Sequence, residues 1–158
     1  MSFVNRLRPD MIAIAPPWHG FRDTVTGLVA LLVHASALPE SREDDAVGAV
    51  VAREREGSTA VLEIGVGVPH ARLSGLHETV VALGVSREGL YEPVPTVGIP
   101  IVALVLSPTG AANDHLRTLA SISTLLRSPE LREALIRSAA PDAALAALDR
   151  HSRSAPLG

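Results

Sequence analysis

Two histidines of this sequence stand where an imidazole could do chemistry. His70 directly follows Pro69, after an apolar run from Ile64 to Val68 that is typical of a buried strand. Because proline brings no N–H to a ladder, we expect the strand to end there and to present His70 on a rigid support. Imidazole is a competent nucleophile near neutral pH, and its N–P bond stays reactive enough for the group to move on. The sequence therefore predicts that His70 carries a phosphoryl group.

His115 has the second informative position, at the expected start of a helix that follows a central strand and the glycine of its loop, Gly110. A helix N-terminus presents free N–H groups and positive potential, which stabilise a phosphate. A transferring phosphoryl group also needs fixed positive groups around its oxygens. We therefore expect His115 and an arginine to share one site with His70.

A metal site is the alternative use of the same residue types. His70, His77, His115 and Asp114 could ligate zinc, but the sequence has no His-x-x-x-His pair or comparable short ligand spacing. The chain has no cysteine, and all 14 of its cationic residues are arginine, so thiolate, Schiff-base and P-loop lysine mechanisms are excluded. A Gly-x-Ser-x-Gly hydrolase turn and a complete dinucleotide fingerprint are also missing. We expect no metal and no cofactor.

Composition indicates one globular domain over residues 1–158, with its core at about residues 10–150 and a flexible tail at 151–158. Apolar residues make up 47% of the chain and charged residues 20%. With 3% aromatic residues and a net charge of −3, neither base stacking nor a basic surface favours a nucleic-acid partner. No apolar run approaches the roughly 20 residues of a membrane span, and the first residues lack a secretory signal. We therefore expect a cytoplasmic protein without direct membrane insertion.

Local patterns predict the elements that must position the histidines. Strands are expected at residues 11–15, 64–68, 78–85 and 100–106, and helices at residues 21–37, 41–55, 113–127, 129–138 and 141–150. Residues 11–15 should form an edge strand because Pro16 and Pro17 follow. Residues 100–106 should form a central strand because they are apolar on both faces. This order predicts an α/β (α+β) fold, a mixed β-sheet of about five strands flanked by helices on both faces.

Four motifs in this order carry a family resemblance: Arg53-Glu54, Gly57-Ser58-Thr59, Val68-Pro69-His70-Ala71-Arg72, and Asp114-His115-Leu116-Arg117-Thr118-Leu119-Ala120. From about Val25 to Leu148 the chain resembles the enzyme IIA domains of the fructose–mannitol class of the bacterial phosphoenolpyruvate phosphotransferase system (PTS), including the nitrogen-regulatory members. The resemblance implies the type-2 PTS IIA fold and a phosphocarrier. Such a domain accepts a phosphoryl group from phospho-HPr and passes it to a IIB-type partner in sugar transport or its regulation.

The same resemblance implies roles for individual residues. His70 would be the phosphorylated nucleophile, His115 the second active-site histidine, and Arg53 the charge partner of the phosphate. Ser58 or Thr59 would donate a hydrogen bond, with a plain turn role as the alternative. We expect Arg72 at the surface, where it could face an acidic patch on a partner.

The segment from Ala60 to Val68 departs from the family pattern. The usual Gly-Ile-Gly-Asn-Gly-type loop is replaced by a segment one residue longer that contains Glu63. A carboxylate turned toward the site would oppose a phosphate electrostatically. A second interpretation therefore stays open, a regulatory protein-binding domain of the same fold with little or no phosphotransfer.

Overall fold

The sheet of this protein is organised around one long central strand. The computed structural model describes residues 2–154, and its six strands are β1 (Ile12–Ile14), β2 (Ala60–Val61), β3 (Val66–Gly67), β4 (His70–Leu73), β5 (Val80–Val85) and β6 (Ile101–Pro108). β6 pairs with β5 antiparallel on one side and with both β3 and β4 in parallel on the other. β1 extends the sheet beyond β5, and β2 extends it beyond β3. The expected edge strand and the expected central strand are both confirmed.

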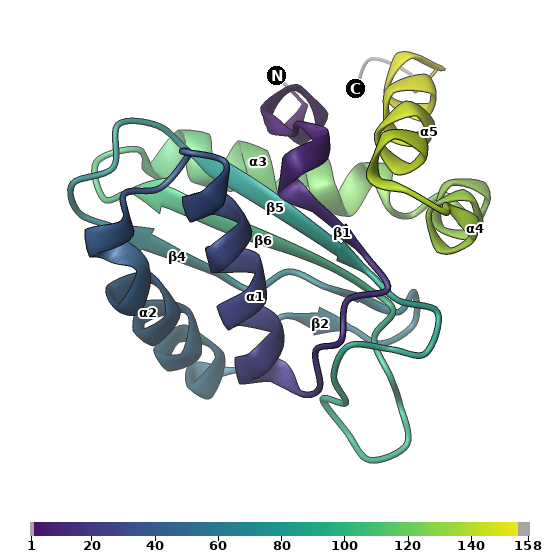
Figure 1. The fold of residues 1–158 in the computed structure, drawn as a ribbon, viewed down its shortest axis with the longest axis horizontal. Helices are drawn as coiled ribbons and strands as arrows, with labels where there is room; N and C mark the ends of the chain where they lie inside the picture. Colours follow the sequence, from purple (N-terminus) through teal and green to yellow (C-terminus); the bar gives the residue numbers. More distant parts are fainter. Residues whose placement is uncertain (1, 155–158) are drawn as a thin grey trace.

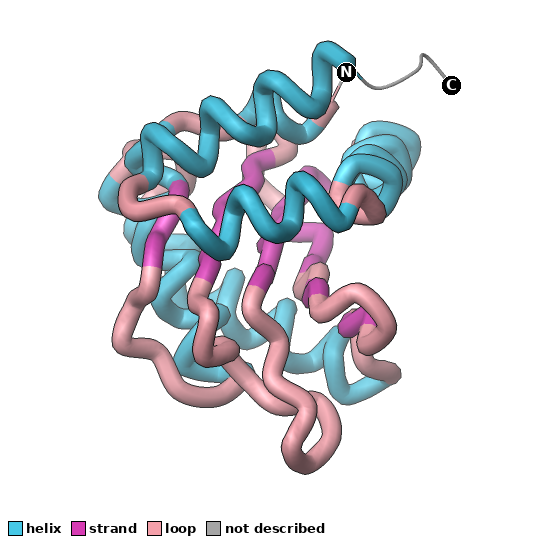
Figure 2. The backbone as a smooth tube through the Cα atoms, turned by 90° about the vertical axis from the view of Figure 1, so that its right-hand side faces the viewer, coloured by secondary structure: helices cyan, strands magenta, loops and turns pink. Residues whose placement is uncertain are grey.

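Helices lie on both faces of this sheet, which confirms the predicted fold class (Figures 1 and 2). They are α1 (Phe21–His34), α2 (Glu43–Glu56), α3 (Ala112–Leu125), α4 (Pro129–Arg137) and α5 (Pro141–Ser154), with 3-10 turns η1 (Phe3–Arg6), η2 (Pro9–Met11) and η3 (Glu40–Arg42). In Figure 1, α1 and α2 lie in front of the sheet and α3 lies behind it. Within residues 2–154, no helix combines the length and the apolar character needed to cross a membrane.

The structure corrects the strand predicted over residues 64–68. Residues 62–65 form a tight turn, with Gly65 at a φ of 66°, between the short strands β2 and β3. Pairing with β6 then resumes at His70, opposite Val105. Pro69 has no N–H, yet its carbonyl accepts a hydrogen bond from Val105 N at 3.0 Å, so the proline interrupts the strand without ending the pairing. His70 therefore begins a strand rather than following one.

The C-terminal helix is longer than predicted. Residues 151–154, expected to belong to a flexible tail, form the last turn of α5, and residues 155–158 lie outside the described part of the chain. Two side chains support this turn. His151 Nδ1 lies 2.9 Å from the carbonyl of Ala147, and Arg153 forms an ion pair with Asp149 at 3.0 Å. Cations near a helix C-terminus are stabilising, so the helix continues through them.

The N-terminal turn η1 is packed into the structure, which local patterns did not predict. Phe3 is fully buried, and its backbone N–H donates to Ser121 Oγ on α3 at 3.1 Å. The Arg6 guanidinium donates to the carbonyl of Thr79 at 3.0 Å and to the carboxylate of Asp114. The N-terminal turn therefore ties together the beginning of β5 and the first turn of α3.

Candidate functional site

The two histidines singled out in the sequence lie side by side. His70 comes from the first residue of β4 and His115 from the first turn of α3. Their ring centroids are 5.3 Å apart, and the ring planes are inclined at 58°. His70 is half-buried, whereas His115 is only 8% exposed. An imidazole that solvent can reach is thus backed by one that is nearly enclosed.

The backbone next to Pro69 fixes the orientation of His70. Nδ1 of this ring lies 2.8 Å from the carbonyl oxygen of Val68. A carbonyl can only accept, so the proton of the neutral ring is on Nδ1 and the lone pair is on Nε2. The Val68 peptide is itself held, because its N–H donates to the carbonyl of Thr59 at 3.2 Å. His70 therefore offers Nε2, and not Nδ1, to an electrophile.

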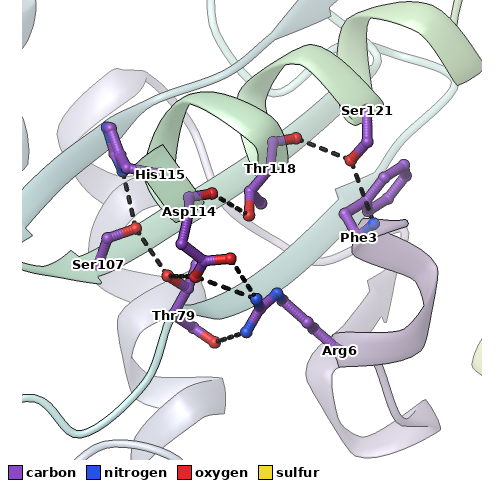
Figure 3. Close-up of polar contacts among 8 residues, drawn as sticks. All are labelled: Phe3, Arg6, Thr79, Ser107, Asp114, His115, Thr118 and Ser121. Atoms are coloured by element: carbon purple, nitrogen blue, oxygen red, sulfur yellow. Dashed lines mark hydrogen bonds and ion pairs between the residues drawn. The ribbon is translucent and has the colours of Figure 1, made fainter. Parts of the chain in front are cut away.

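A chain of side chains behind His115 ends in an ion pair (Figure 3). His115 Nδ1 lies 2.7 Å from Ser107 Oγ, which lies 3.1 Å from Thr79 Oγ1. Thr79 Oγ1 lies 2.6 Å from the Asp114 carboxylate, and Arg6 pairs with that carboxylate at 2.8 Å. His115, Ser107 and Thr79 are all buried, whereas the Asp114 side chain at the far end is 41% exposed. Sequence analysis named Asp114 as a possible metal ligand and as part of a family motif, and it missed Arg6, Thr79 and Ser107.

Strand register explains how these side chains meet. Arg72 of β4 pairs with Ser107 of β6, and the β5–β6 register that joins Val80 to Leu106 brings Thr79 opposite Ser107. Residues paired directly across neighbouring strands point to the same face. Arg72, Ser107 and Thr79 therefore form a row across the end of the sheet, beside the first turn of α3. In the sequence, Thr79 directly precedes one buried apolar run and Ser107 directly follows another. This placement was the available signal that the two hydroxyls belong to the site.

The local charges act on His115 in opposite directions. Burial holds the pKa of this imidazole below its usual range, and the neighbouring His70 and the Arg72 guanidinium lower the pKa further, whereas the Asp114 carboxylate raises it. Arg72 is exposed, and no hydrogen bond or ion pair joins its side chain to another of residues 2–154. The site thus combines two imidazoles with a guanidinium that is free to bind an anion.

Arg53 and Ser58, which sequence analysis placed at the site, lie at the end of α2. The Arg53 guanidinium donates to the carbonyl of Gly57 at 3.1 Å, and no hydrogen bond joins it to His70 or His115. Ser58 is exposed, and its hydroxyl accepts from the N–H of Ala60 at 3.2 Å, as in a plain turn. Within residues 2–154, no hydrogen bond or ion pair joins either side chain to His70, His115 or Arg72.

Thr59 is linked to His70 through its backbone rather than through its hydroxyl. Both the N–H and the hydroxyl of Thr59 donate to the carboxylate of Glu54, with the N–H at 2.9 Å. The carbonyl of Thr59 then accepts from Val68, whose own carbonyl orients His70. Glu54 was recognised in the sequence only as half of the Arg-Glu motif. It serves here as the anchor of the segment that positions His70.

The geometry does not support the alternative metal site. Residues 2–154 hold no group of three or more histidine, aspartate or glutamate side chains that could bind a metal ion. Asp114 is engaged by Arg6 and Thr79, and His77 lines a separate pocket of about 540 Å³ near the end of α1. Glu63, the carboxylate of the lengthened segment, is exposed in the turn between β2 and β3. β3 pairs with the first residues of β6, away from the register position of His70.

Comparison with known sequences places these features in one family. A family model described as "Phosphoenolpyruvate-dependent sugar phosphotransferase system, EIIA 2" matches residues 8–151. The fructose-specific EIIABC component of Bacillus subtilis is 31% identical over 106 residues, which are 66% of this chain but only 16% of that protein. A nitrogen regulatory protein of Bradyrhizobium diazoefficiens is 32% identical over 109 residues, 68% of this chain and 71% of that protein. Relatives in sugar transport and in nitrogen regulation therefore match at similar sequence identity.

Solved structures share the fold. The nitrogen regulatory protein IIA-Ntr of Neisseria meningitidis superposes with a TM-score of 0.76 at 24% identity, covering 92% of this chain and 97% of that one. The mannitol enzyme IIA of Escherichia coli, solved in complex with phosphorylated enzyme IIB, gives a TM-score of 0.75 at 16% identity, covering 95% and 99%. The six-stranded arrangement described above is thus an established one.

Proposed function

Because this chain belongs to the EIIA 2 family of the phosphoenolpyruvate-dependent sugar phosphotransferase system, we propose that it carries a phosphoryl group on Nε2 of His70. The donor is a phosphohistidine protein of the HPr type, and the acceptor is a IIB-type protein or a regulatory target, all in the cytoplasm. One observation carries this proposal. The ring centroids of His70 and His115 are 5.3 Å apart. Nδ1 of His70 is hydrogen-bonded to the Val68 carbonyl and Nδ1 of His115 to the Ser107 hydroxyl, which leaves both Nε2 atoms free.

The transfer step needs no proton movement. The Nε2 lone pair of His70 attacks the phosphorus of the donor phosphohistidine, and the new N–P bond forms as the donor N–P bond breaks. The donor imidazole leaves with the electron pair of the broken bond, and each ring keeps the proton on its other nitrogen. The Nδ1–H of His70 stays bonded to the Val68 carbonyl, so the ring becomes cationic when Nε2 is phosphorylated, and the N–P bond stays reactive. The reverse sequence passes the group to the acceptor.

Arg72 fits the role of phosphate charge partner better than Arg53. The Arg72 guanidinium is free, and its charge acts on His115, whereas Arg53 is bonded to the Gly57 carbonyl. Charge on the transferring group spreads over its equatorial oxygens, so positive charge beside them stabilises the transition state. We therefore assign this role to Arg72 together with His115, with Arg53 holding the end of α2.

A regulatory output is the second candidate, and it has its own support. Nitrogen regulatory proteins are among the relatives at 32% identity, and the lengthened segment with Glu63 distinguishes this chain from the usual loop. Glu63 does not weaken the phosphocarrier proposal, because it is exposed in the turn before β3, and β3 pairs with Ile101 and Val102 whereas His70 pairs with Val105. The two outputs therefore differ in what accepts the phosphoryl group from His70, rather than in whether His70 carries it.

Labelling with a complete donor system tests the proposal. The protein is incubated with phosphoenolpyruvate, enzyme I and HPr, and we expect an acid-labile, base-stable mass increase of one phosphate that is lost in His70→Ala. Arg72→Gln should slow labelling by roughly 100-fold, the scale for removing one oxyanion-binding group, while the matched variant Arg53→Gln should not. Labelling that persists in His70→Ala would refute the site. Discharge by a IIB protein would identify the transport output, and its failure with a labelled protein would identify the regulatory one.

A further inference from the structure

The two hydroxyl groups behind His115 have fewer protons than polar contacts. This shortage determines which group donates and which accepts in each hydrogen bond. Thr79 Oγ1 has one proton but contacts both the Asp114 carboxylate at 2.6 Å and Ser107 Oγ at 3.1 Å. Ser107 likewise has one proton and two contacts, to Thr79 and to His115. Arg6 donates to both oxygens of the Asp114 carboxylate, at 2.8 and 3.0 Å. An ionised carboxylate only accepts, so the short contact takes the proton of Thr79.

With that proton assigned, one arrangement satisfies every contact. Ser107 donates to Thr79 Oγ1, which leaves Ser107 Oγ as the acceptor for a proton on His115 Nδ1. In the other arrangement Ser107 would donate to His115, and two buried oxygens 3.1 Å apart would face each other with no proton between them. Buried polar contacts without a proton are costly, so the first arrangement is strongly favoured. The hydrogen bonds then run in one direction, from the His115 ring to the Asp114 carboxylate.

We propose that Ser107, Thr79, Asp114 and Arg6 are positioning residues that keep His115 protonated on Nδ1 and leave its Nε2 as the basic atom beside His70. This inference rests on the proposed function. When a phosphoryl group arrives on His70, its negative charge favours the uptake of one H⁺ from the buffered solvent at the Nε2 lone pair of His115, after the N–P bond has formed. The resulting imidazolium donates from Nε2 to a phosphoryl oxygen, and its Nδ1–H charge is stabilised along the chain by the Asp114 carboxylate.

The series of hydrogen bonds behind His115 ends at Arg6, which lies outside the residues that the family model matches. The family model begins at residue 8, whereas Arg6 belongs to the turn η1. Arg6 is held there by three bonds, two to Asp114 and one to the Thr79 carbonyl, and its side chain is 18% exposed. The N-terminal turn therefore supplies the cation that pairs with the Asp114 carboxylate and holds it in place. The support for His115 thus includes a residue that lies before the segment matched by the family model.

The tautomer of His115 in the unphosphorylated protein tests the proposal directly. We expect ¹⁵N NMR of the full chain, above the pKa of His115, to show the proton on Nδ1 and a pyridine-like Nε2. In Thr79→Val the hydroxyl of Ser107 has lost its acceptor and turns to His115 Nδ1, so the proton should move to Nε2. Thr79→Ser restores the hydroxyl and should restore the Nδ1–H form. Thr118→Val is the matched control, because the Thr118 hydroxyl is also buried but donates to the backbone carbonyl of Asp114.

Phosphotransfer gives the second readout. Thr79→Val and Asp114→Asn should slow phosphorylation of His70 by roughly 10- to 100-fold, the scale seen for partners that orient a functional histidine, with Thr118→Val unchanged. An Nε2–H tautomer in the unmodified protein, or a Thr79→Val protein that keeps Nδ1–H, would overturn the proposal. Because the tautomer is read without phosphate, a protein that shows the predicted tautomers but is never phosphorylated would refute the proposed function alone.

Discussion

Replacing Gly67 by alanine tests how closely β3 is packed beside the site. A Cβ at this position would lie 2.2 Å from the hydroxyl oxygen of Tyr91 and 3.1 Å from its Cζ. Tyr91 has little room to retreat, because it is 6% exposed and its ring packs edge-on against Phe21 with centroids 5.1 Å apart. Overpacking of this kind costs about 1–3 kcal/mol. We expect Gly67→Ala to lower the free energy of unfolding by about 2 kcal/mol.

Removing the Tyr91 hydroxyl should cancel most of that cost. The hydroxyl is buried and has no hydrogen-bond partner within residues 2–154, so Tyr91→Phe alone should be neutral or slightly stabilising. In the Tyr91→Phe background the contact of the added Cβ with the hydroxyl is gone, and the two remaining contacts, with Cζ at 3.1 Å and Cε1 at 3.2 Å, are only tight. The double variant should therefore lose less than about 1 kcal/mol, which gives a coupling energy of about 1–2 kcal/mol.

Urea unfolding followed by the fluorescence of Trp18, the single tryptophan, measures all four proteins of this cycle. Gly48→Ala is the matched control. It lies within α2 with nothing within 4 Å of its added Cβ, so it should stabilise the protein by up to about 1 kcal/mol. An equal cost of Gly67→Ala in the Tyr91 and Tyr91→Phe backgrounds would refute the steric reasoning.

Three further predictions concern pH, a helix cap and the segment behind His70. Burial and the neighbouring imidazole and guanidinium keep the pKa of His115 below 6.5, so below that pH the unfolded chain binds more protons than the native one. The free energy of unfolding should therefore fall as the pH drops below about 6.5, and less steeply in His115→Gln by urea titration. Ser128→Ala removes the N-cap acceptor of α4 and should cost about 1 kcal/mol by the same assay, with an effect under 0.3 kcal/mol contradicting the cap. In Glu54→Gln the N–H and hydroxyl of Thr59 donate to a neutral amide instead of a carboxylate, which should lower the free energy of unfolding by about 1–2 kcal/mol. An unchanged unfolding midpoint would show that these hydrogen bonds contribute nothing.

The elements predicted most accurately are those set by local chemistry. The apolar run near residue 101 is buried on both faces, and only a central strand covered by helices on both sides satisfies that pattern. Ser128 followed by Pro129 marks the start of α4 within a few residues, because capping and a fixed proline φ are both local effects. The proximity of His70 and His115 followed from the expected position of each at the end of an element, although His70 proved to begin its strand.

The sequence did not reveal how the strand before His70 is divided. Proline was expected to end pairing, since it lacks an N–H. Whether pairing resumes depends on the partner strand, and β6 supplies a Val105 N–H that the Pro69 carbonyl accepts. A two-residue strand such as β2 also has too few residues for an alternating pattern to be visible. Local patterns therefore find the segment but not its register.

The chain behind His115 could not have been derived from local spacing. Arg6 is 108 residues from Asp114, and Thr79 is 28 residues from Ser107. These contacts exist only because the antiparallel register of β5 and β6 brings two hydroxyls opposite each other and because η1 docks on α3. The same applies to Arg72 and Arg53, whose surroundings depend on tertiary packing that a motif does not describe.

The central position of β6 has a consequence for how the chain reaches its native state. Three strands, β3, β4 and β5, pair with β6, although two of them precede it by about 30 residues or more. During synthesis, those earlier segments emerge without the template on which they assemble, and parallel pairing over such separations is slow. We expect nascent chains that stop before Ile101 to expose apolar segments to chaperones and to collapse cooperatively only after residue 108 has left the ribosome.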